Sequence, residues 1–384
     1  MFYINLLNKY HMRKKLFTSV VCLIFLSGIS CAQPPDWGSL PGGNVTLNGQ
    51  QISKVGIGDV NNYSNYPYNA VSFYVCAHED DWQLFMGYQT WYDVRSYDES
   101  AAKPNGAKVV IICITDGAYP NDASCTYNNN DPVQGNFCSP TLPLPYSQIR
   151  EKGSINSVNI MANSNPYPLS VVSPYPSAGY VLINSHNIYC YRYKNTVSYF
   201  IRLNSYALSL WFSANSLSLY SNPCGDVTAT GNTSDGYSYY GESDLVTTIA
   251  GIYNYETNIF GDVVPGDIPW INTQDPNIWF NTCDNFDHIA SGMLAYQAAQ
   301  TFSGMLPGTP TIPINLWEDY CISGGACSPS FPVNLGSPDV ENKSALISAY
   351  EVALLKNNSS IEIDAWPGYL NRSYNRIINS ITPY

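Results

Sequence analysis

The segment Val71–Gly87, which reads VSFYVCAHEDDWQLFMG, joins an apolar run to a histidine and three acids. His78 and Asp81 lie three residues apart, so both side chains could point the same way from one turn. An imidazole and a carboxylate supply half of a zinc site. Asp80, next to Asp81, would then stay free to act as a general base. The simpler alternative is that these acids cap a helix, because acids oppose the positive end of the helix dipole.

The residues around this cluster predict a strand followed by a helix. Val71–Cys76 is apolar and rich in β-branched and aromatic side chains, which is typical of a buried strand. From Asp81 to about Tyr97 apolar residues recur at helical spacing, with acids at the amino-terminal end. In an open α/β sheet, ligands bind outside the carboxyl ends of the strands. The cluster therefore lies where such a sheet would bind a ligand.

The rest of the chain alternates between predicted strands and helices. Further strands are expected at Lys108–Thr115, Val197–Leu203, Ile268–Asn272 and Thr311–Leu316. Further helices are expected at Pro145–Ala162, Ser243–Phe260, Asp287–Phe302 and Pro338–Lys356. Strands separated by helices predict an α/β fold, a Rossmann-like three-layer sandwich in which both faces of a mostly parallel sheet are covered.

Two short motifs carry a resemblance to a known family. Ala77–Gly87 reads AHEDDWQLFMG, and Asn285–His288 reads NFDH at the start of a predicted helix. The first resembles the AHPDDE signature and the second the HxDH motif of the PIG-L/LmbE-like family of zinc-dependent N-acetylglucosamine deacetylases. Ile114–Gly117 follows a strand as in that family, and Val197–Leu203 resembles its secreted branch. The motifs occur in the expected order, and two motifs with complementary ligands are more specific than one.

The resemblance implies an LmbE-like fold, a bound Zn²⁺ ion and hydrolysis of the N-acetyl group of an N-acetylglucosamine-type sugar. It implies that His78, Asp81 and His288 bind the zinc ion. Asp80 would be the general base. A site of two histidines and one carboxylate is a known catalytic zinc arrangement, with one position left open.

The resemblance also implies roles for four further residues. Asp287 would take part in catalysis by orienting a neighbouring group, or would cap its helix, and the two roles can coexist. Asp116, Arg150 and Asn285 match positions that face the substrate. A turn with Gly117 is the structural alternative for Asp116, and a surface ion pair is the alternative for Arg150.

The chain departs from the family pattern at Asn285, where members often have a histidine that stabilises the oxyanion or protonates the leaving amine. An asparagine can donate a hydrogen bond but cannot deliver a proton. Trp82 also stands where the common signature has glutamate, as in the secreted branch. The alternative function is therefore a catalytically weak or inactive glycan-binding protein that retains the fold and the metal site. His186 lies outside these motifs and is expected to be an ordinary hydrogen-bonded histidine.

The composition narrows the range of partners. The chain has 32 tyrosines, 12% charged residues and a net charge of −12. A net negative charge argues against nucleic acid and anionic membranes as partners. Neutral sugars remain compatible, because tyrosine and tryptophan rings can stack on them. The sequence does not indicate the oligomeric state.

The amino terminus predicts export. Residues 1–32 read as a secretory signal peptide, with basic residues 13–15 before the apolar run Leu16–Leu26. Cleavage could follow Ala32, or Cys31 could be the lipidated first residue of a lipoprotein and anchor the chain. Residues 33–384 are then expected to form a single domain without a membrane span, of which 33–68 is a surface extension. The protein would be secreted, periplasmic or lipid-anchored at the cell surface.

Export also permits disulfides. The loops between cysteines suggest three pairs: Cys125–Cys138, Cys321–Cys327 and Cys190–Cys224. Cys76 and Cys113 lie inside apolar strands and are expected to be buried free thiols.

Overall fold

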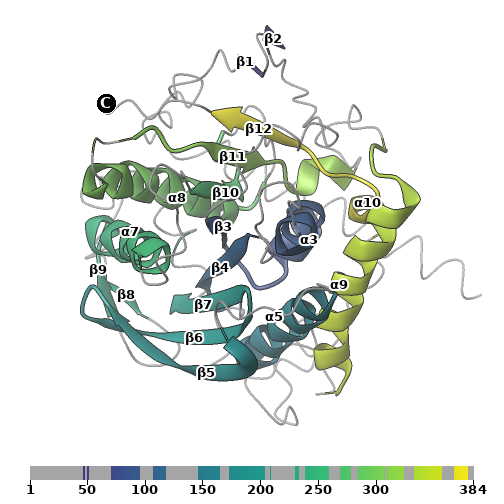
Figure 1. The fold of residues 1–384 in the computed structure, drawn as a ribbon, viewed down its shortest axis with the longest axis horizontal. Coiled ribbons are helices and arrows are strands. Elements are labelled where there is room, and N and C mark those ends of the chain that lie inside the picture. Colours follow the sequence, from purple (N-terminus) through teal and green to yellow (C-terminus); the bar gives the residue numbers. More distant parts are fainter. Residues whose placement is uncertain are drawn as a thin grey trace, which may run out of the picture.

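The computed structural model describes residues 46–47, 50–51, 71–95, 107–117, 146–164, 173–203, 208, 230–232, 238–258, 269–277, 284–306, 308, 310–323, 333–356 and 367–378. An eight-stranded sheet forms the centre of this part of the chain (Figure 1). In order across the sheet, its strands are β12 (Asn375–Ile378), β11 (Ile314–Trp317), β10 (Trp270–Gln274), β3 (Val71–Cys76), β4 (Lys108–Thr115), β7 (Thr196–Leu203), β6 (His186–Lys194) and β5 (Ser173–Ile183). The strands from β11 to β7 are parallel, with antiparallel β12 at one edge and the antiparallel hairpin β5–β6 at the other.

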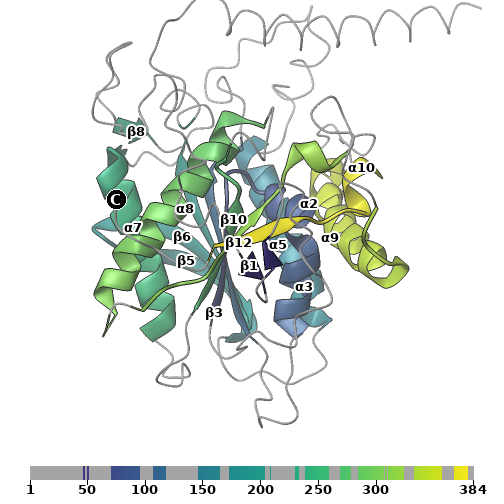
Figure 2. The same ribbon diagram turned by 90° about the horizontal axis from the view of Figure 1, so that it is seen from above.

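Helices cover both faces of the sheet (Figure 2). One face carries α7 (Glu242–Asn258) and α8 (Phe286–Met305). The opposite face carries α2 (Asp81–Phe85), α3 (Gly87–Arg95), α5 (Tyr146–Asn163) and α9 (Ser337–Lys356). The remaining elements are short: η3 (Tyr320–Ser323), α10 (Pro367–Leu370) and the two-stranded ribbons β1 (Thr46–Leu47) with β2 (Gln50–Gln51) and β8 (Thr230–Asn232) with β9 (Ser238–Tyr240). The predicted α/β fold with a mostly parallel sheet is confirmed.

The sequence of strand β3 is apolar throughout because both of its faces are buried. All six of its residues are buried. Phe73 and Val75 pack in the core formed with α7 and α8, whereas Tyr74 and Cys76 pack in the core on the opposite face. A strand that is buried on both faces has no polar side to alternate with, so it reads as a continuous apolar run.

The parallel strands bring distant segments to one end of the sheet, which we call the carboxyl end. Strands β3, β4, β7, β10 and β11 all finish there, because they run in the same direction. The turn after β3 therefore lies near the segments that follow β4, β10 and β11. This is the end at which open α/β sheets bind their ligands.

The structure differs from the prediction at one helix and at one hairpin. The helix expected from Asp81 is divided at Met86 into α2 and α3. Close packing accounts for the glycine that begins α3, because a Cβ on Gly87 would lie 3.3 Å from Leu346 Cδ1 of α9. The hairpin β5–β6 was not predicted. Its turn at Asn184 and Ser185 has positive φ angles of 47° and 66°, which is the geometry that Asn-Gly usually signals.

Several predictions lie outside the described residues. They are the signal peptide with Cys31, most of the extension 33–68, and the side chains of Cys125, Cys138, Cys224, Cys321 and Cys327. Cys190 is a buried free thiol in β6, so it forms no pair with Cys224 in this structure. Cys76 and Cys113 are buried free thiols as predicted, with their sulfur atoms 3.6 Å apart. No helix in the described part of the chain is both long and apolar enough to span a membrane.

Candidate metal centre

The turn between β3 and α2 does not use its acids as helix caps. Asp80 occupies the N-cap position of α2 but makes no capping hydrogen bond with its side chain. Asp81 is held instead through Oδ2, which accepts from the backbone N–H of His78 at 2.7 Å and from Nε2 of Gln274 at 3.2 Å. Gln274 is the last residue of β10, so the neighbouring strand helps to orient Asp81. The second carboxylate oxygen of Asp81, Oδ1, accepts no hydrogen bond and faces His288.

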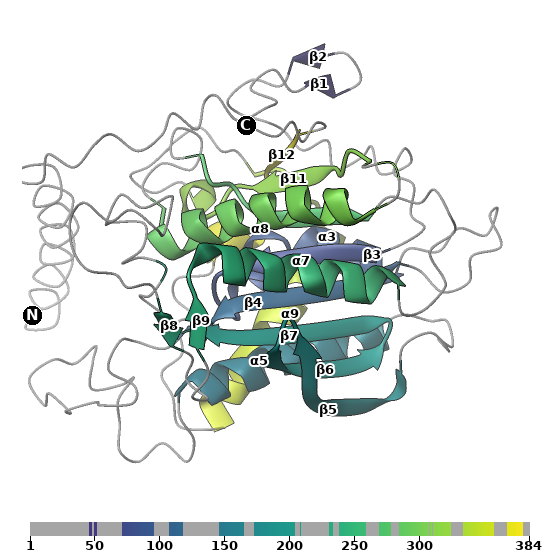
Figure 3. The ribbon, with the colours of Figure 1, turned by 90° about the vertical axis from the view of Figure 1, so that its left-hand side faces the viewer.

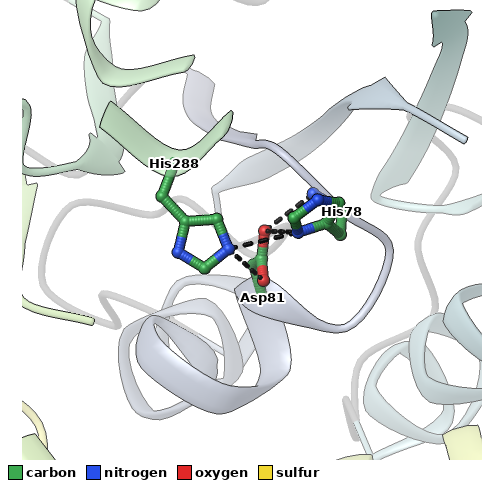
Figure 4. A group of neighbouring side chains, drawn as sticks. All are labelled: His78, Asp81 and His288. Atoms are coloured by element: carbon green, nitrogen blue, oxygen red, sulfur yellow. Dashed lines mark hydrogen bonds and ion pairs between the residues drawn. The ribbon is translucent and has the colours of Figure 1, made fainter. Parts of the chain in front are cut away.

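His78, Asp81 and His288 converge on one point (Figure 4). Nδ1 of His78 lies 3.1 Å from Nε2 of His288 and 3.3 Å from Oδ2 of Asp81. Nε2 of His288 lies 3.2 Å from Oδ1 of Asp81. Tetrahedral zinc with bonds of about 2.1 Å places neighbouring ligand atoms ~3.4 Å apart. The two histidine nitrogens, and the Asp81 oxygen that faces each of them, have almost this spacing, so the three residues fit a zinc ion.

The second nitrogen of each histidine faces a carboxylate. Nε2 of His78 lies 3.3 Å from Oδ2 of Asp287. Nδ1 of His288 lies 3.0 Å from Oδ1 of Asp284 and 3.3 Å from Oδ2 of Asp319. Carboxylates in this position fix the tautomer and the ring orientation of metal-binding histidines. The arrangement leaves one nitrogen of each ring to face the other donors.

The first turn of α8 divides two roles between neighbouring residues. Asn285 is the N-cap residue, and its Oδ1 accepts from the backbone N–H of Asp287 at 2.9 Å. Asp287 is buried, and its carboxylate faces His78. Of the two roles predicted for Asp287, the structure therefore shows the contact with a neighbouring group, while Asn285 provides the side-chain cap.

The electrostatics of the three residues favour a cation between them. Burial alone would lower the pKa of His78, but the carboxylates of Asp81 and Asp287 outweigh it and raise the pKa to about 9. Burial also opposes the charged form of His288, and Asp81 and Asp284 raise its pKa well above the ordinary value. Burial would raise the pKa of Asp81, but the two histidines lower it. Because histidines bind metals in the neutral form, metal uptake would release the protons that they hold.

Asp80 lies on the more open side of this group and is held by Arg150 of α5. The side chain of Asp80 is 16% exposed, against 1% for Asp81. Nη2 of Arg150 donates to Oδ1 of Asp80, and Nη1 donates to the carbonyl of Gly117 at 2.7 Å. Nε of Arg150 lies 3.2 Å from Oε2 of the buried Glu79. The ion pair expected for Arg150 exists, but it lies against the candidate site and is largely buried.

Asp116 lies at the carboxyl end of β4 and is buried. Its backbone N–H donates to the carbonyl of Leu203 at 2.8 Å, which ties the exit of β4 to the exit of β7. Burial raises the pKa of the Glu79 carboxyl, and the nearby carboxylate of Asp116 raises it further. Asp116 thus borders the group formed by Glu79 and Arg150.

The sequence did not reveal several residues of the site. Asp319 follows β11, and Asp284 lies four residues before His288. Tyr320 stacks on His288, with ring centroids 4.9 Å apart and an interplanar angle of 27°. The spacing of Asp284 to His288 was a usable signal, because residues four apart meet on a helix surface and at its start. His186 lies elsewhere, on β6, and forms the hydrogen bond that was expected of it, with Oδ1 of Asp244 at 2.9 Å.

No family model and no curated protein matches the chain. Three of the solved structures to which the chain is similar show the degree of similarity. The zinc-inhibited form of teicoplanin deacetylase Orf2 is 14% identical, with a TM-score of 0.36, over 77% of this chain and 90% of that one. A deacetylase–teicoplanin complex is 14% identical, with a TM-score of 0.35, over 81% and 100%. GalB, the 4-carboxy-2-hydroxymuconate hydratase from Pseudomonas putida KT2440, is 11% identical, with a TM-score of 0.36, over 78% and 82%. Similarity of this degree assigns the chain to no family.

Proposed function

We propose that the chain is a zinc-dependent hydrolase that removes the acetyl group from an N-acetylglucosamine-type amino sugar outside the cytoplasm. The observation that carries the proposal is the convergence of His78, Asp81 and His288: their facing nitrogen and carboxylate oxygen atoms lie 3.1 to 3.3 Å apart, with a different Asp81 oxygen facing each histidine. The same residues belong to the two motifs that resemble the PIG-L/LmbE-like deacetylases. Geometry and motif therefore support the same set of ligands.

The chain's own residues have separate roles in this proposal. A zinc ion held there would act as a Lewis acid and lower the pKa of a water towards about 7. Asp80 lies in the same turn as His78 and Asp81 without being one of the ligands, so it accepts the proton of the attacking water and returns it to the leaving amine. Arg150 fixes the orientation of the Asp80 carboxylate. Asp287 holds the ring of His78 in place.

The surroundings are compatible with a neutral sugar as substrate. The net charge of −12 disfavours anionic partners. Asn285 and Asp116 border the site, but Asn285 uses its Oδ1 for the helix cap, which leaves its amide N–H groups as the donors available to a substrate. Export through the signal at residues 1–32, with cleavage after Ala32 or lipidation at Cys31, completes the proposal.

Release of acetate from a panel of N-acetylated sugars, with and without a chelator, tests the proposal. Asp80→Asn should keep the fold and the zinc content, because no ligand is lost. Turnover should fall by about 10²–10⁴-fold, the usual worth of a general acid–base group. His186→Gln is the matched control, since this histidine also pairs with a carboxylate but lies outside the site. An Asp80→Asn protein as active as the parent would show that the base is another group.

One observation favours the alternative, a glycan-binding protein that lacks efficient catalysis. Asn285 replaces a residue that could deliver a proton, and its side chain is engaged as a helix cap. A parent protein that binds zinc and N-acetylated sugars but releases no acetate from any of them would support this alternative.

A further inference from the structure

We propose that Tyr180, Tyr189 and Arg202 form a second sugar subsite, which binds a neutral sugar ring of the same glycan whose acetyl group is removed at the metal centre. This inference rests on the proposed function. It assigns a role to the hairpin β5–β6 and to the end of β7, neither of which the proposed chemistry uses.

The first observation concerns the hairpin β5–β6, which forms one edge of the sheet (Figure 3) and carries exposed apolar side chains. Tyr180 is 53% exposed and Leu182 is 67% exposed. They alternate with Val181 and Ile183, which pack in the core beneath α7, so they point to the face that carries α5. Tyr180 lies against Tyr189 of β6, with ring centroids 5.6 Å apart in an edge-to-face arrangement.

The second observation is the unusual conformation of Arg202, near the end of β7. Its φ angle is +64°, in the left-handed region that non-glycine residues rarely adopt. The pairing of β7 with β4 is irregular at the same place. Strained residues of this kind persist where the surroundings fix them, and they cluster at binding and catalytic sites.

The side chain of Arg202 is fixed from three directions. It donates to both carboxylate oxygens of Glu151, from Nε at 2.5 Å and from Nη2 at 2.8 Å. Nη1 donates to the hydroxyl of Tyr180 at 3.2 Å. Its guanidinium lies 4.4 Å from the centre of the Tyr189 ring, within the range of a cation–π contact. Tyr180 and Tyr189 are therefore held in place before any ligand arrives.

Helix α5 contributes a residue to each of the two places. Glu151, which binds Arg202, directly follows Arg150, which binds Asp80. Strand β7 ends at the carboxyl end of the sheet, beside β4 and its exit residue Asp116. A glycan with one sugar at the metal centre could therefore extend across α5 to the hairpin.

The chemistry of the surface fits a neutral sugar ring. Glu151 balances the charge of Arg202, so the surface does not select for a charged group. Tyrosine rings offer an apolar face to the C–H side of a sugar, while their hydroxyls and the guanidinium can bond with sugar hydroxyls. Aromatic residues that are already ordered lose little conformational entropy when they bind.

The test compares the binding of N-acetylglucosamine and of its β-1,4-linked tetramer by titration calorimetry on the zinc-loaded protein. The tetramer should bind about tenfold more tightly than the monomer, because it reaches both sites. Tyr180→Ala should remove most of this gain, about tenfold, and leave monomer binding unchanged, since truncation of an aromatic anchor usually costs this much. Tyr180→Phe keeps the ring and should stay within about threefold of the parent.

Tyr175→Ala is the matched control. Tyr175 lies on the same strand and is 77% exposed, but it is near the start of β5, at the opposite end of the sheet. Its truncation should leave tetramer binding unchanged. Equal affinity for monomer and tetramer, absence of binding, or an equal effect of Tyr175→Ala and Tyr180→Ala would each overturn the inference.

Acetate release separates this inference from the proposed function. Tetramer binding that depends on Tyr180, without release of acetate, would sustain the subsite and refute the hydrolase. Release of acetate from the tetramer at the same KM in the parent and in Tyr180→Ala would sustain the hydrolase and refute the subsite.

Discussion

Gly117 offers a direct test of how the site is positioned, through the variant Gly117→Ala. The glycine follows β4 with a φ angle of +58°, where an L-residue costs about 1–2 kcal/mol. A Cβ there would overlap Oε2 of Glu79 and lie 2.7 Å from Nε and Cζ of Arg150. Overpacking of this kind adds about 1–3 kcal/mol. The free energy of unfolding should therefore fall by about 2–5 kcal/mol.

The same substitution should also lower turnover in the proposed reaction. The methyl group displaces Arg150, and Arg150 holds Asp80. A displacement of about 1 Å of a positioned group can cost about 10²-fold in rate. Zinc content should stay the same, because His78, Asp81 and His288 do not touch the new methyl group. Urea unfolding, acetate release and metal analysis measure the three effects.

Gly308→Ala supplies the control for backbone strain alone. Its φ angle is +77°, but a Cβ there would meet no atom within 4 Å. This variant should lose only about 1–2 kcal/mol of stability and keep its turnover. If both variants lost the same stability and the same activity, contact with Glu79 and Arg150 would not be the cause, and the reasoning would be refuted.

Two further predictions concern buried groups. Asp287→Ala should lower zinc affinity by about 10–100-fold, because it releases His78. Asp244→Ala releases His186, Asn184 and the backbone N–H of Tyr240, none of which is a candidate ligand, and should leave zinc affinity unchanged. Equal zinc affinities of the two variants in a competition assay with a chelator would contradict this. Burial lowers the pKa of Lys343 from 10.5 to about 7. Between these pH values the unfolded chain therefore holds a proton that the folded chain lacks. The contribution of Lys343 to the free energy of unfolding should thus increase as pH rises. Lys343→Met should remove this gain between pH 7 and 9 in urea unfolding, and an unchanged pH dependence would contradict the assignment.

The strands that the sequence predicted well are those buried on both faces. Lys108–Thr115 has the predicted bounds, since it is apolar along most of its length and fully buried. Strand β10 was placed two residues early, because Asn272, Thr273 and Gln274 are polar yet buried. Their side chains serve neighbouring groups: Asn272 donates to the carbonyl of Phe73, and Gln274 donates to Asp81. Polar residues that are satisfied by a neighbouring strand leave no hydrophobic pattern to read.

The hairpin β5–β6 was missed for a related reason. Residues 175–180 of β5 are all exposed, so they lack the alternation that identifies a strand with one buried face. The turn at Asn184 and Ser185 contains no glycine, although both residues have positive φ angles. An edge strand that binds a ligand on its open surface would be expected to lack this signal.

Local spacing explains which parts of the site were predictable. His78 and Asp81 occur in one short motif, and His288 lies in the first turn of a predicted helix, so the sequence alone identified all three as candidate ligands. Asp319 reaches His288 only because β11 pairs with β10 and β10 pairs with β3. No spacing along the chain encodes that contact. It follows from the order of the strands, which the sequence did not determine.

Asn285 has a structural role that bears on the proposed mechanism. Helix α8 carries His288 in its first turn, so the start of this helix must be well fixed. Asn285 provides the cap, and a good N-cap is worth about 1 kcal/mol. Because the cap is made by Asn285, the carboxylate of Asp287 is available to hold His78. An asparagine cannot return a proton to a leaving amine, so in the proposed reaction that task falls to Asp80, the acid that Arg150 holds on the open side of the site.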